Sequence, residues 1–299
     1  MASIKNLTLS AGLALAGLIL PASLYAGTES KAVVDTTTKS AITGDLGVNF
    51  VSEYISRGAP QEVKGTIAQP YADLYFSLYE GEGFLNKVSL NLGVWSSLHS
   101  THTLAGSSNG TNVSTVPAWY EFDYTPGLAF TFAKNYTFTA SYFEFDSPNG
   151  GFVTSRNINL NLAYNDTDLL GAFALHPHVT YLRELDGKAV NGYSTKEGNY
   201  YEVGIAPALP AYGPVTVTIP VTAGFGSDNF YLDNKGFGFL SAGLNASVAL
   251  PIPTKYGTWA FNAGATYYYL PDQTAWVYAK ENTVDNSRVV YQAGIGATF

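Results

Sequence analysis

The sequence predicts an all-β protein: a transmembrane, antiparallel, up-and-down β-barrel of about 12 strands with short periplasmic turns and longer extracellular loops. Three observations support this prediction: a leader at the N-terminus, long segments of alternating polarity, and an aromatic residue at the carboxyl terminus. The composition agrees, since 46% of the 299 residues are hydrophobic and only 13% are charged. That is about half the charged share of an ordinary soluble domain. A formal charge of −8 argues against a nucleic-acid partner.

Residues 1–26 have the features of a secretory signal peptide. Lys5 precedes an uncharged, Leu/Ala/Gly-rich run over 7–20, and small residues lead to a cleavage site after Ala26. An uncleaved membrane anchor is the alternative, for which the apolar run is short. The chain has no Cys, which excludes disulfides and thiol catalysis. We therefore expect a signal peptide (1–26), a flexible periplasmic N-terminal segment (27–43) and one transmembrane β-barrel domain (44–299).

Alternation with a period of two dominates the chain after the leader. In 215–226, apolar side chains occupy the odd positions, while Thr, Pro and Gly occupy the even ones. In 157–165, Asn residues share one face opposite Ile, Leu and Tyr, and such a face suits water better than a dry core. Segments of this kind are predicted as strands over 44–57, 66–79, 84–98, 117–132, 135–146, 152–164, 170–185, 198–209, 213–227, 236–249, 257–270 and 288–299.

The last segment carries the most specific signal. Apolar residues alternate with Gly, Gln and Thr from Val289 to the terminal Phe299. An amphipathic final strand that ends in an aromatic residue is typical of the assembly signal of outer-membrane barrels, with Tyr291 and Phe299 as its members here. The partners it implies are the barrel-assembly machinery and periplasmic chaperones, together with outer-membrane lipids.

The physical reason for a barrel is that backbone groups in hydrocarbon must pair internally, so a sheet must close on itself. The alternative is a soluble periplasmic β-sandwich or lipocalin-like barrel, which has the same local alternation. Two features oppose that alternative. The polar faces contain few Lys or Glu, and the segments are longer than typical soluble strands.

The first predicted strand contains Ser52-Glu53-Tyr54-Ile55-Ser56-Arg57-Gly58, after Gly47-Val48-Asn49-Phe50. This run resembles the opening strand of the TorF-like porins, exported proteins of Gram-negative bacteria with a Ser-x-Tyr-x-x-Arg-Gly motif near the mature N-terminus. The match is local. The resemblance implies pore activity in the bacterial outer membrane and carries over no catalytic residue.

If the apolar phase faces lipid, the opposite phase lines the interior. Acidic residues outnumber basic ones on that phase, which favours cations in a pore. The alternative is that Glu53, Arg57 and their neighbours form a paired structural network, and the residues do not decide between the two. The predicted pore-lining residues are Glu53, Arg57, Tyr71, Asp73, Tyr75, Trp119, Glu121, Asp123, His176, His178 and Glu202.

Enzymatic function finds little support in the sequence. The loop at 106–110 is similar to the Ser-Asn-Gly of outer-membrane phospholipases, but Gly106 stands where that motif needs a His, and a Ser without a placed base is a weak nucleophile. His176 and His178 lie on the same face of a predicted strand, where two imidazoles could help to bind a metal. With only 4 His in the chain, an ordinary interior pair is favoured over a metal site. We predict no catalytic residue, metal or cofactor.

The function predicted from the sequence is a porin or channel for passive diffusion of ions or small polar solutes, with a weak preference for cations. A non-transporting structural or adhesive barrel is the first alternative. A lipid-modifying outer-membrane enzyme is the second, and it has less support.

Overall fold

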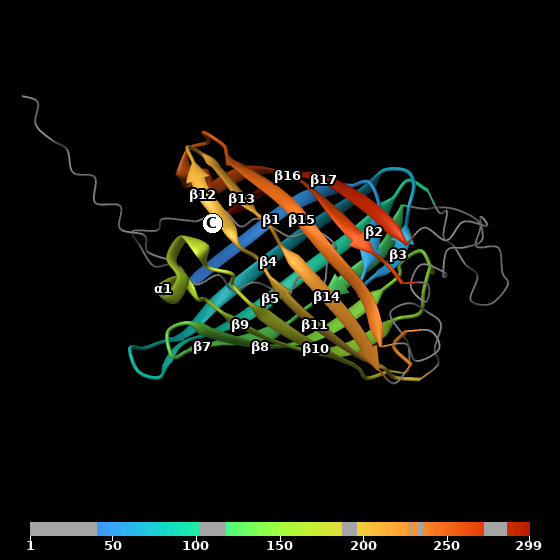
Figure 1. Cartoon of the computed structure of the whole chain (residues 1–299), viewed down its shortest axis with the longest axis horizontal. Coiled ribbons are helices and arrows are strands. Elements are labelled where there is room, and N and C mark those ends of the chain that lie inside the picture. Colours follow the sequence, from blue (N-terminus) through green and yellow to red (C-terminus); the bar gives the residue numbers. More distant parts are fainter. Residues whose placement is uncertain (1–40, 102–117, 187–195, 228, 232–235, 272–285) are drawn as a thin grey trace, which may run out of the picture.

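The computed structural model describes residues 41–101, 118–186, 196–227, 229–231, 236–271 and 286–299. They form a closed antiparallel barrel of twelve strands, as predicted (Figure 1). The sheet closes where β1 pairs with the last strand, β17, on one side and with β4 on the other. The predicted signal peptide, most of the predicted periplasmic segment and the loop at 106–110 lie outside the described residues.

Seventeen strands and three short helical turns make up the described residues. The strands are β1 (Ile42–Val51), β2 (Tyr54–Ser56), β3 (Ala59–Glu62), β4 (Ile67–Glu80), β5 (Leu85–His99), β6 (Trp119–Tyr124), β7 (Gly127–Phe132), β8 (Tyr136–Asp146), β9 (Ser155–Tyr164), β10 (His178–Glu184), β11 (Asn199–Ile205), β12 (Ala208–Tyr212), β13 (Val215–Thr218), β14 (Val221–Ser227), β15 (Phe237–Ala249), β16 (Thr258–Tyr269) and β17 (Ser287–Thr298). The helical turns are α1 (Thr167–Leu170), η1 (Gly171–Phe173) and η3 (Thr254–Tyr256).

Three of the twelve barrel strands are interrupted, and each interruption contains a proline. Pro126 separates β6 from β7, Pro207 separates β11 from β12, and Pro220 separates β13 from β14. Proline lacks the N–H that a ladder position requires, so pairing is broken locally while the strand continues. The two halves keep the same neighbours; for example, β6 and β7 both pair with β5 and β8.

Two predicted strands are shorter than expected. The segment predicted over 44–57 leaves the barrel wall after Val51, and the chain turns inward to form β2 and β3. The segment predicted over 170–185 begins with η1 and enters the wall only at His178, because Asp166 and Gly171 (φ 57°) shape a helical turn before it.

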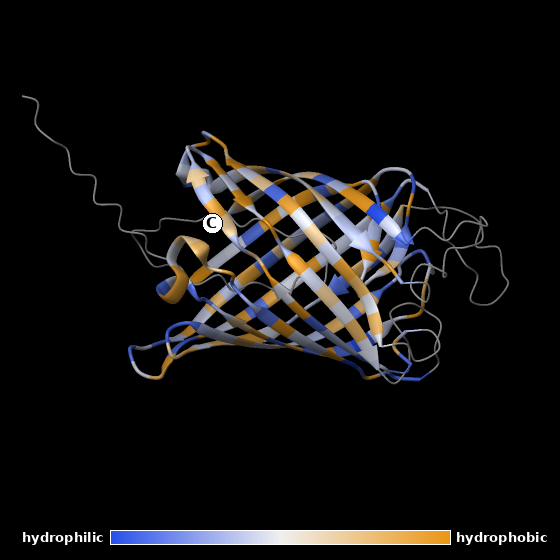
Figure 2. Ribbon diagram, viewed as in Figure 1, coloured by the Kyte–Doolittle hydropathy of each residue, from blue (hydrophilic) through white to orange (hydrophobic). Residues whose placement is uncertain are grey.

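Side chains alternate between the two faces of the wall, as the sequence pattern predicts. On β1, Leu46 and Phe50 are 41% and 49% exposed, whereas Asp45 is 6% exposed. Figure 2 shows the result as hydrophobic and hydrophilic residues in turn along the strands. The exterior is apolar and the interior is polar over much of its length.

The two ends of the barrel differ. At the turn end, on the left in Figure 1, Gly44 and Phe299 exchange backbone hydrogen bonds of 2.9 Å, and α1 lies at the same end between β9 and β10. Short turns such as 81–84, 133–135 and 213–214 connect strands there. The opposite end, where β1 finishes and β4 begins, is here named the loop end.

Candidate functional site: a hairpin inside the barrel

A β-hairpin lies inside the barrel at the loop end. β2 pairs with β3 as a two-stranded sheet separate from the wall. Arg57 (φ 48°) and Gly58 (φ 82°) form its two-residue turn, and a tight hairpin turn of this kind needs positive φ at both positions. Tyr54 and Ile55 are each only 1% exposed. The hairpin is therefore an interior element and not a surface loop.

The base of the hairpin packs against one side of the wall. The ring centroid of Tyr54 lies 5.5 Å from that of Trp95 on β5 and 6.4 Å from that of Tyr120 on β6. The Tyr120 hydroxyl donates to Oε1 of Gln61 at 2.8 Å. Burial raises the pKa of the Tyr54 hydroxyl well above 10, and the nearby carboxylate of Glu121 raises it further. Tyr54 is consequently neutral at physiological pH.

The tip of the hairpin reaches other parts of the wall. The Tyr231 hydroxyl donates to the carbonyl oxygen of Arg57 at 2.7 Å. The Arg57 guanidinium carbon lies 4.9 Å from the ring centroid of Phe145 on β8 and 5.9 Å from that of Tyr200 on β11. β8 is the neighbour of β6, whereas β11 is separated from β8 by β9 and β10, so the hairpin reaches from the β5–β6 side of the interior to a more distant part of the wall.

An apolar core surrounds the hairpin. The alternation of polarity predicts a polar inner face, so this apolar core is a finding of the structure. Its strand residues alternate with exterior ones and fall on the inner face at the loop end of each strand. Its members are Val51, Tyr54, Ile55, Ile67, Trp95, Phe143, Phe145, Leu182, Tyr200, Phe230, Tyr231, Phe239, Tyr268, Leu270 and Val290.

Away from this core the inner face is polar. The Tyr75 hydroxyl donates to Asp45 at 2.9 Å, and Asn161 donates to Oγ1 of Thr180 at 3.0 Å. Gln292 donates to the side-chain oxygen of Asn245 at 3.0 Å. Buried polar groups need such partners.

Carboxylates lie on the inner wall beside the hairpin. Glu121 and Asp123 come from β6 and are 7% and 0% exposed. Glu202, from β11, accepts a hydrogen bond of 2.6 Å from the Tyr200 hydroxyl and lies 3.6 Å from Nε2 of His178. Acidic side chains therefore outnumber basic ones around the hairpin, where Arg57 contributes a positive charge.

Most of the predicted pore-lining residues lie inside the barrel. Tyr71, Asp73, Tyr75, Glu121, Asp123, His178 and Glu202 lie on the inner phase of the wall, and Arg57 lies on the hairpin. Glu53 forms an ion pair of 2.9 Å with Arg288 of β17, a partner that the alternation of polarity does not identify.

Two of the placements were wrong. Trp119 is 48% exposed and lies against Phe122 on the outer phase, since an irregularity in the β5–β6 pairing at Ser97 and Leu98 shifts the alternation. His176 does not share a strand face with His178. It lies in the turn before β10 with φ 49°, and its Nδ1 is 3.8 Å from Asp166.

The residues of the Ser-x-Tyr-x-x-Arg-Gly motif each have a structural role in the hairpin. Ser52 accepts a hydrogen bond from the backbone N–H of Tyr291 at 2.9 Å, which fixes the hairpin base to β17. Tyr54 packs into the core, and Arg57 and Gly58 form the turn. The predicted strand over 44–57 includes Arg57 and misses this turn, although the Gly and Pro of Arg57-Gly58-Ala59-Pro60 are a signal that could have indicated it.

A Ser–His pair also lies inside the barrel, and the sequence motifs do not single it out. Ser97 Oγ and His99 Nε2 are 2.8 Å apart, and the His99 ring stacks on Tyr120 at 4.4 Å. Ser97 and His99 are 0% and 2% exposed. A substrate has no access to this pair beneath the hairpin, so the geometry is that of a structural contact.

The exterior has two aromatic belts. Near the turn end, Tyr136 stacks on Tyr164 at 4.6 Å and on Phe132 at 5.6 Å. Near the loop end, Tyr181 lies 5.4 Å from Tyr201. Aromatic residues of this kind mark both interfaces of a membrane.

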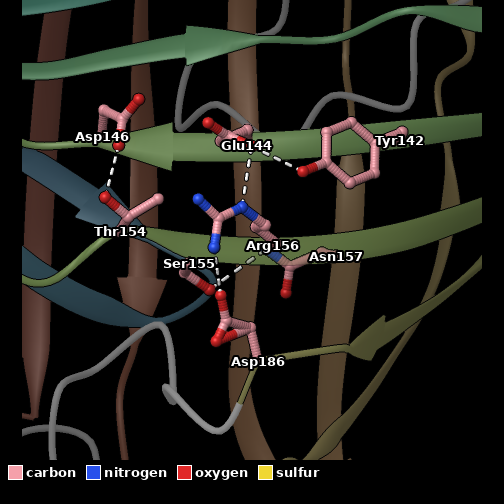
Figure 3. A network of polar contacts seen from close by, with 8 residues as sticks. All are labelled: Tyr142, Glu144, Asp146, Thr154, Ser155, Arg156, Asn157 and Asp186. Carbon is pink, nitrogen blue, oxygen red and sulfur yellow. Dashed lines mark hydrogen bonds and ion pairs between the residues drawn. The ribbon is translucent and has the colours of Figure 1, made fainter.

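A polar network bounds the apolar exterior at the loop end (Figure 3). Arg156 donates from Nε to Glu144 at 3.0 Å and also pairs with Asp186, while Tyr142 donates to Glu144. Arg156 is eight residues from Tyr164 along β9, or about 26 Å of strand. With a tilt of about 40°, the height between them is roughly 20 Å, close to the apolar band of such barrels.

A closed β-barrel with an apolar exterior and two aromatic belts is the construction of a bacterial outer-membrane protein. Within the described residues, no helix is long and apolar enough to cross a membrane. The same part of the chain contains no group of three or more His, Cys, Asp or Glu side chains arranged to hold a metal ion.

No family model and no curated protein matches the chain. Solved structures resemble it only distantly. The NanC porin is 13% identical, with a TM-score of 0.42 over 85% of this chain and 98% of that one. An outer membrane channel from Pseudomonas putida F1 is 9% identical, with a TM-score of 0.49 over 89% and 100%. The translocator domain of the autotransporter NalP from Neisseria meningitidis is 12% identical, with a TM-score of 0.40 over 88% and 90%.

Proposed function

We propose that the chain is an outer-membrane channel for passive diffusion of ions or small polar solutes, narrowed at the loop end by the interior hairpin. The polar inner wall is the observation that carries this proposal. Side chains such as Asn161, Thr180, Gln292 and Asn245 have no role on a lipid-facing surface, and they suit an interior that contains water. The resemblance to TorF-like porins agrees with this proposal and stays a prediction.

A weak preference for cations follows from the charges beside the hairpin. Glu121, Asp123 and Glu202 face the interior, whereas the Arg288 guanidinium is paired with Glu53. Carboxylates along a narrow path lower the barrier for positive ions. Arg57 opposes this effect, which is why the preference is weak.

Reversal potentials across a KCl gradient in planar bilayers test the selectivity. The unaltered protein should show a potential of the sign expected for cation preference, and Glu121→Gln and Glu202→Gln should each reduce it. Glu82→Gln is the matched control, because Glu82 is an exposed residue of the β4–β5 turn, away from the hairpin. A clear anion preference of the unaltered protein would contradict the assignment.

The orientation belongs to the same proposal. We place the turn end in the periplasm and the loop end outside the cell, with residues 1–26 removed on export and the barrel-assembly machinery recognising the final strand. The described turns are short at one end, as in outer-membrane barrels.

A structural or adhesive barrel without transport is the second candidate, and the hairpin is the observation that favours it. Tyr54, Ile55 and the core around them fill the interior at the loop end. Conductance separates the two candidates, since a barrel that inserts into bilayers and never conducts is structural. Neither candidate involves catalysis, and the burial of Ser97 and His99 agrees with that.

A further inference from the structure

We propose that the hairpin from Tyr54 to Glu62 is a removable plug, and that Arg57 is the residue that limits how firmly it is seated. The inference rests on the proposed channel function, because removing a plug has a consequence only in a barrel that conducts. Its starting point is topological: within the described residues, β2 and β3 pair only with each other and not with any wall strand. The hairpin can leave the interior without breaking the barrel's sheet.

The seated position is held chiefly by side chains. Tyr54 and Ile55 are buried in the apolar core at 1% exposure each. The Tyr231 hydroxyl donates to the Arg57 carbonyl oxygen at 2.7 Å and connects the tip to the loop after β14. A Cβ on Gly58 would lie 2.8 Å from the ring of Phe239, so the tip fits closely against β15.

Arg57 opposes the seated position, because its charged group is buried there. Its side chain is 6% exposed, and Nε and Nη2 have no hydrogen-bond acceptor in the described part of the protein. A buried guanidinium with unpaired donors is costly, and the rings of Phe145 and Tyr200 offset only part of that cost.

Withdrawal toward the loop end would relieve the cost of burial, because the guanidinium would regain water while the hairpin keeps its turn. The base of the hairpin would stay in place, because Ser52 is hydrogen-bonded to Tyr291 on one side and Thr66 N–H donates to Ser100 Oγ at 2.7 Å on the other. The hairpin then acts as a tethered plug, with its tip as the part that moves furthest.

Thiol labelling measures the seating directly, and the chain has no native Cys to interfere. Ser56→Cys places a thiol on the plug, where the parent residue is 4% exposed. Val153→Cys is the matched control on the β8–β9 connection, also at the loop end, where the parent residue is 58% exposed. A small, membrane-impermeant maleimide is applied to the folded barrel in liposomes, and folding is checked by circular dichroism and gel mobility.

We expect the thiol on the plug to react at least about 100-fold more slowly than the control. Adding Tyr54→Ala should raise its rate at least about tenfold, because the core loses a fully buried ring. If that variant does not fold, Ile55→Ala serves in its place. Adding Arg57→Met should lower the rate, because a side chain of similar length without unpaired donors seats better.

Equal rates for the plug thiol and the control would overturn the proposal, as would an Arg57→Met variant that reacts as fast as its parent or faster. Labelling does not depend on conduction. A barrel that conducts nothing but shows the expected labelling would remove the channel function and leave the plug as a structural insert. A barrel that conducts but labels at the control rate would remove the plug.

Discussion

Gly58→Ala should unseat the hairpin tip. The variant introduces a methyl group at φ 82°, 2.8 Å from Cδ1 of Phe239 and 3.1 Å from the carbonyl oxygen of Gly238. Overpacking a filled site costs about 1–3 kcal/mol, and this cost exists only in the seated position, because the turn keeps its positive φ when the hairpin withdraws. Since about 1.4 kcal/mol is a factor of ten, the seated fraction relative to the withdrawn one should fall by about fivefold or more.

The assay for Gly58→Ala is the labelling rate of a thiol at position 56, combined with single-channel conductance. Both should rise. Gly83→Ala is the matched control, because a Cβ at Gly83 would meet no atom within 4 Å and this residue has no positive φ. The reasoning is refuted if Gly58→Ala and Gly83→Ala give the same labelling rate and the same conductance as the parent protein.

Three further predictions concern stability and assembly. Asp166 accepts hydrogen bonds from the backbone N–H groups of Leu175 and His176; although burial raises its pKa, these bonds lower it more, so the folded-state pKa is below the ordinary value. The stabilisation is therefore present above about pH 3.9 and is lost as the pH falls through the folded-state pKa. Asp166→Asn should lower the free energy of unfolding by about 1–3 kcal/mol at pH 7, and urea titrations should show this difference shrinking as the pH is lowered below about 3.9. Leu160→Arg puts a charge on the lipid-facing side of β9, midway between Arg156 and Tyr164, and should cost about 2–4 kcal/mol in the same titration in bilayers; an unchanged midpoint would contradict the assigned face. Phe299→Ala should reduce the amount of heat-resistant folded barrel recovered from membranes without changing the soluble level of the chain, and full recovery would remove Phe299 from the assembly signal.

The barrel itself could be predicted because the alternation of polarity is a local property. Each wall strand repeats it over many residues, and the Pro residues that interrupt β6–β7, β11–β12 and β13–β14 leave the phase readable on both sides. The pattern distinguishes the two faces of a strand, and closure follows from the need to pair every backbone group in the membrane.

The interior hairpin could not be predicted in the same way. Its segment continues the alternation of β1, so nothing in the period shows that the chain leaves the wall after Val51. Gly58 and Pro60 are residues that often form turns, but an inward hairpin and an outward loop use the same types of turn residue. The choice is decided by distant residues such as Tyr231 and Phe239, which meet the hairpin only in three dimensions.

The errors at Trp119 and His176 have local causes. A pairing irregularity at Ser97 and Leu98 changes which face Trp119 occupies, and a shift of one residue moves a side chain to the opposite side of the wall. His176 lies in a turn shaped by Asp166, whose carboxylate binds two backbone N–H groups across ten positions of sequence. The alternation of polarity predicts neither the pairing irregularity nor the turn.

The most direct test of the channel assignment is the conductance of two purified proteins in planar bilayers: the unaltered chain, and a variant in which residues 54–62 are replaced by a short Gly-Ser linker. The linker variant should conduct more than the unaltered chain and give a reversal potential of the sign expected for weak cation preference. If the linker variant folds and inserts yet conducts no more than the lipid alone, the barrel is not a channel.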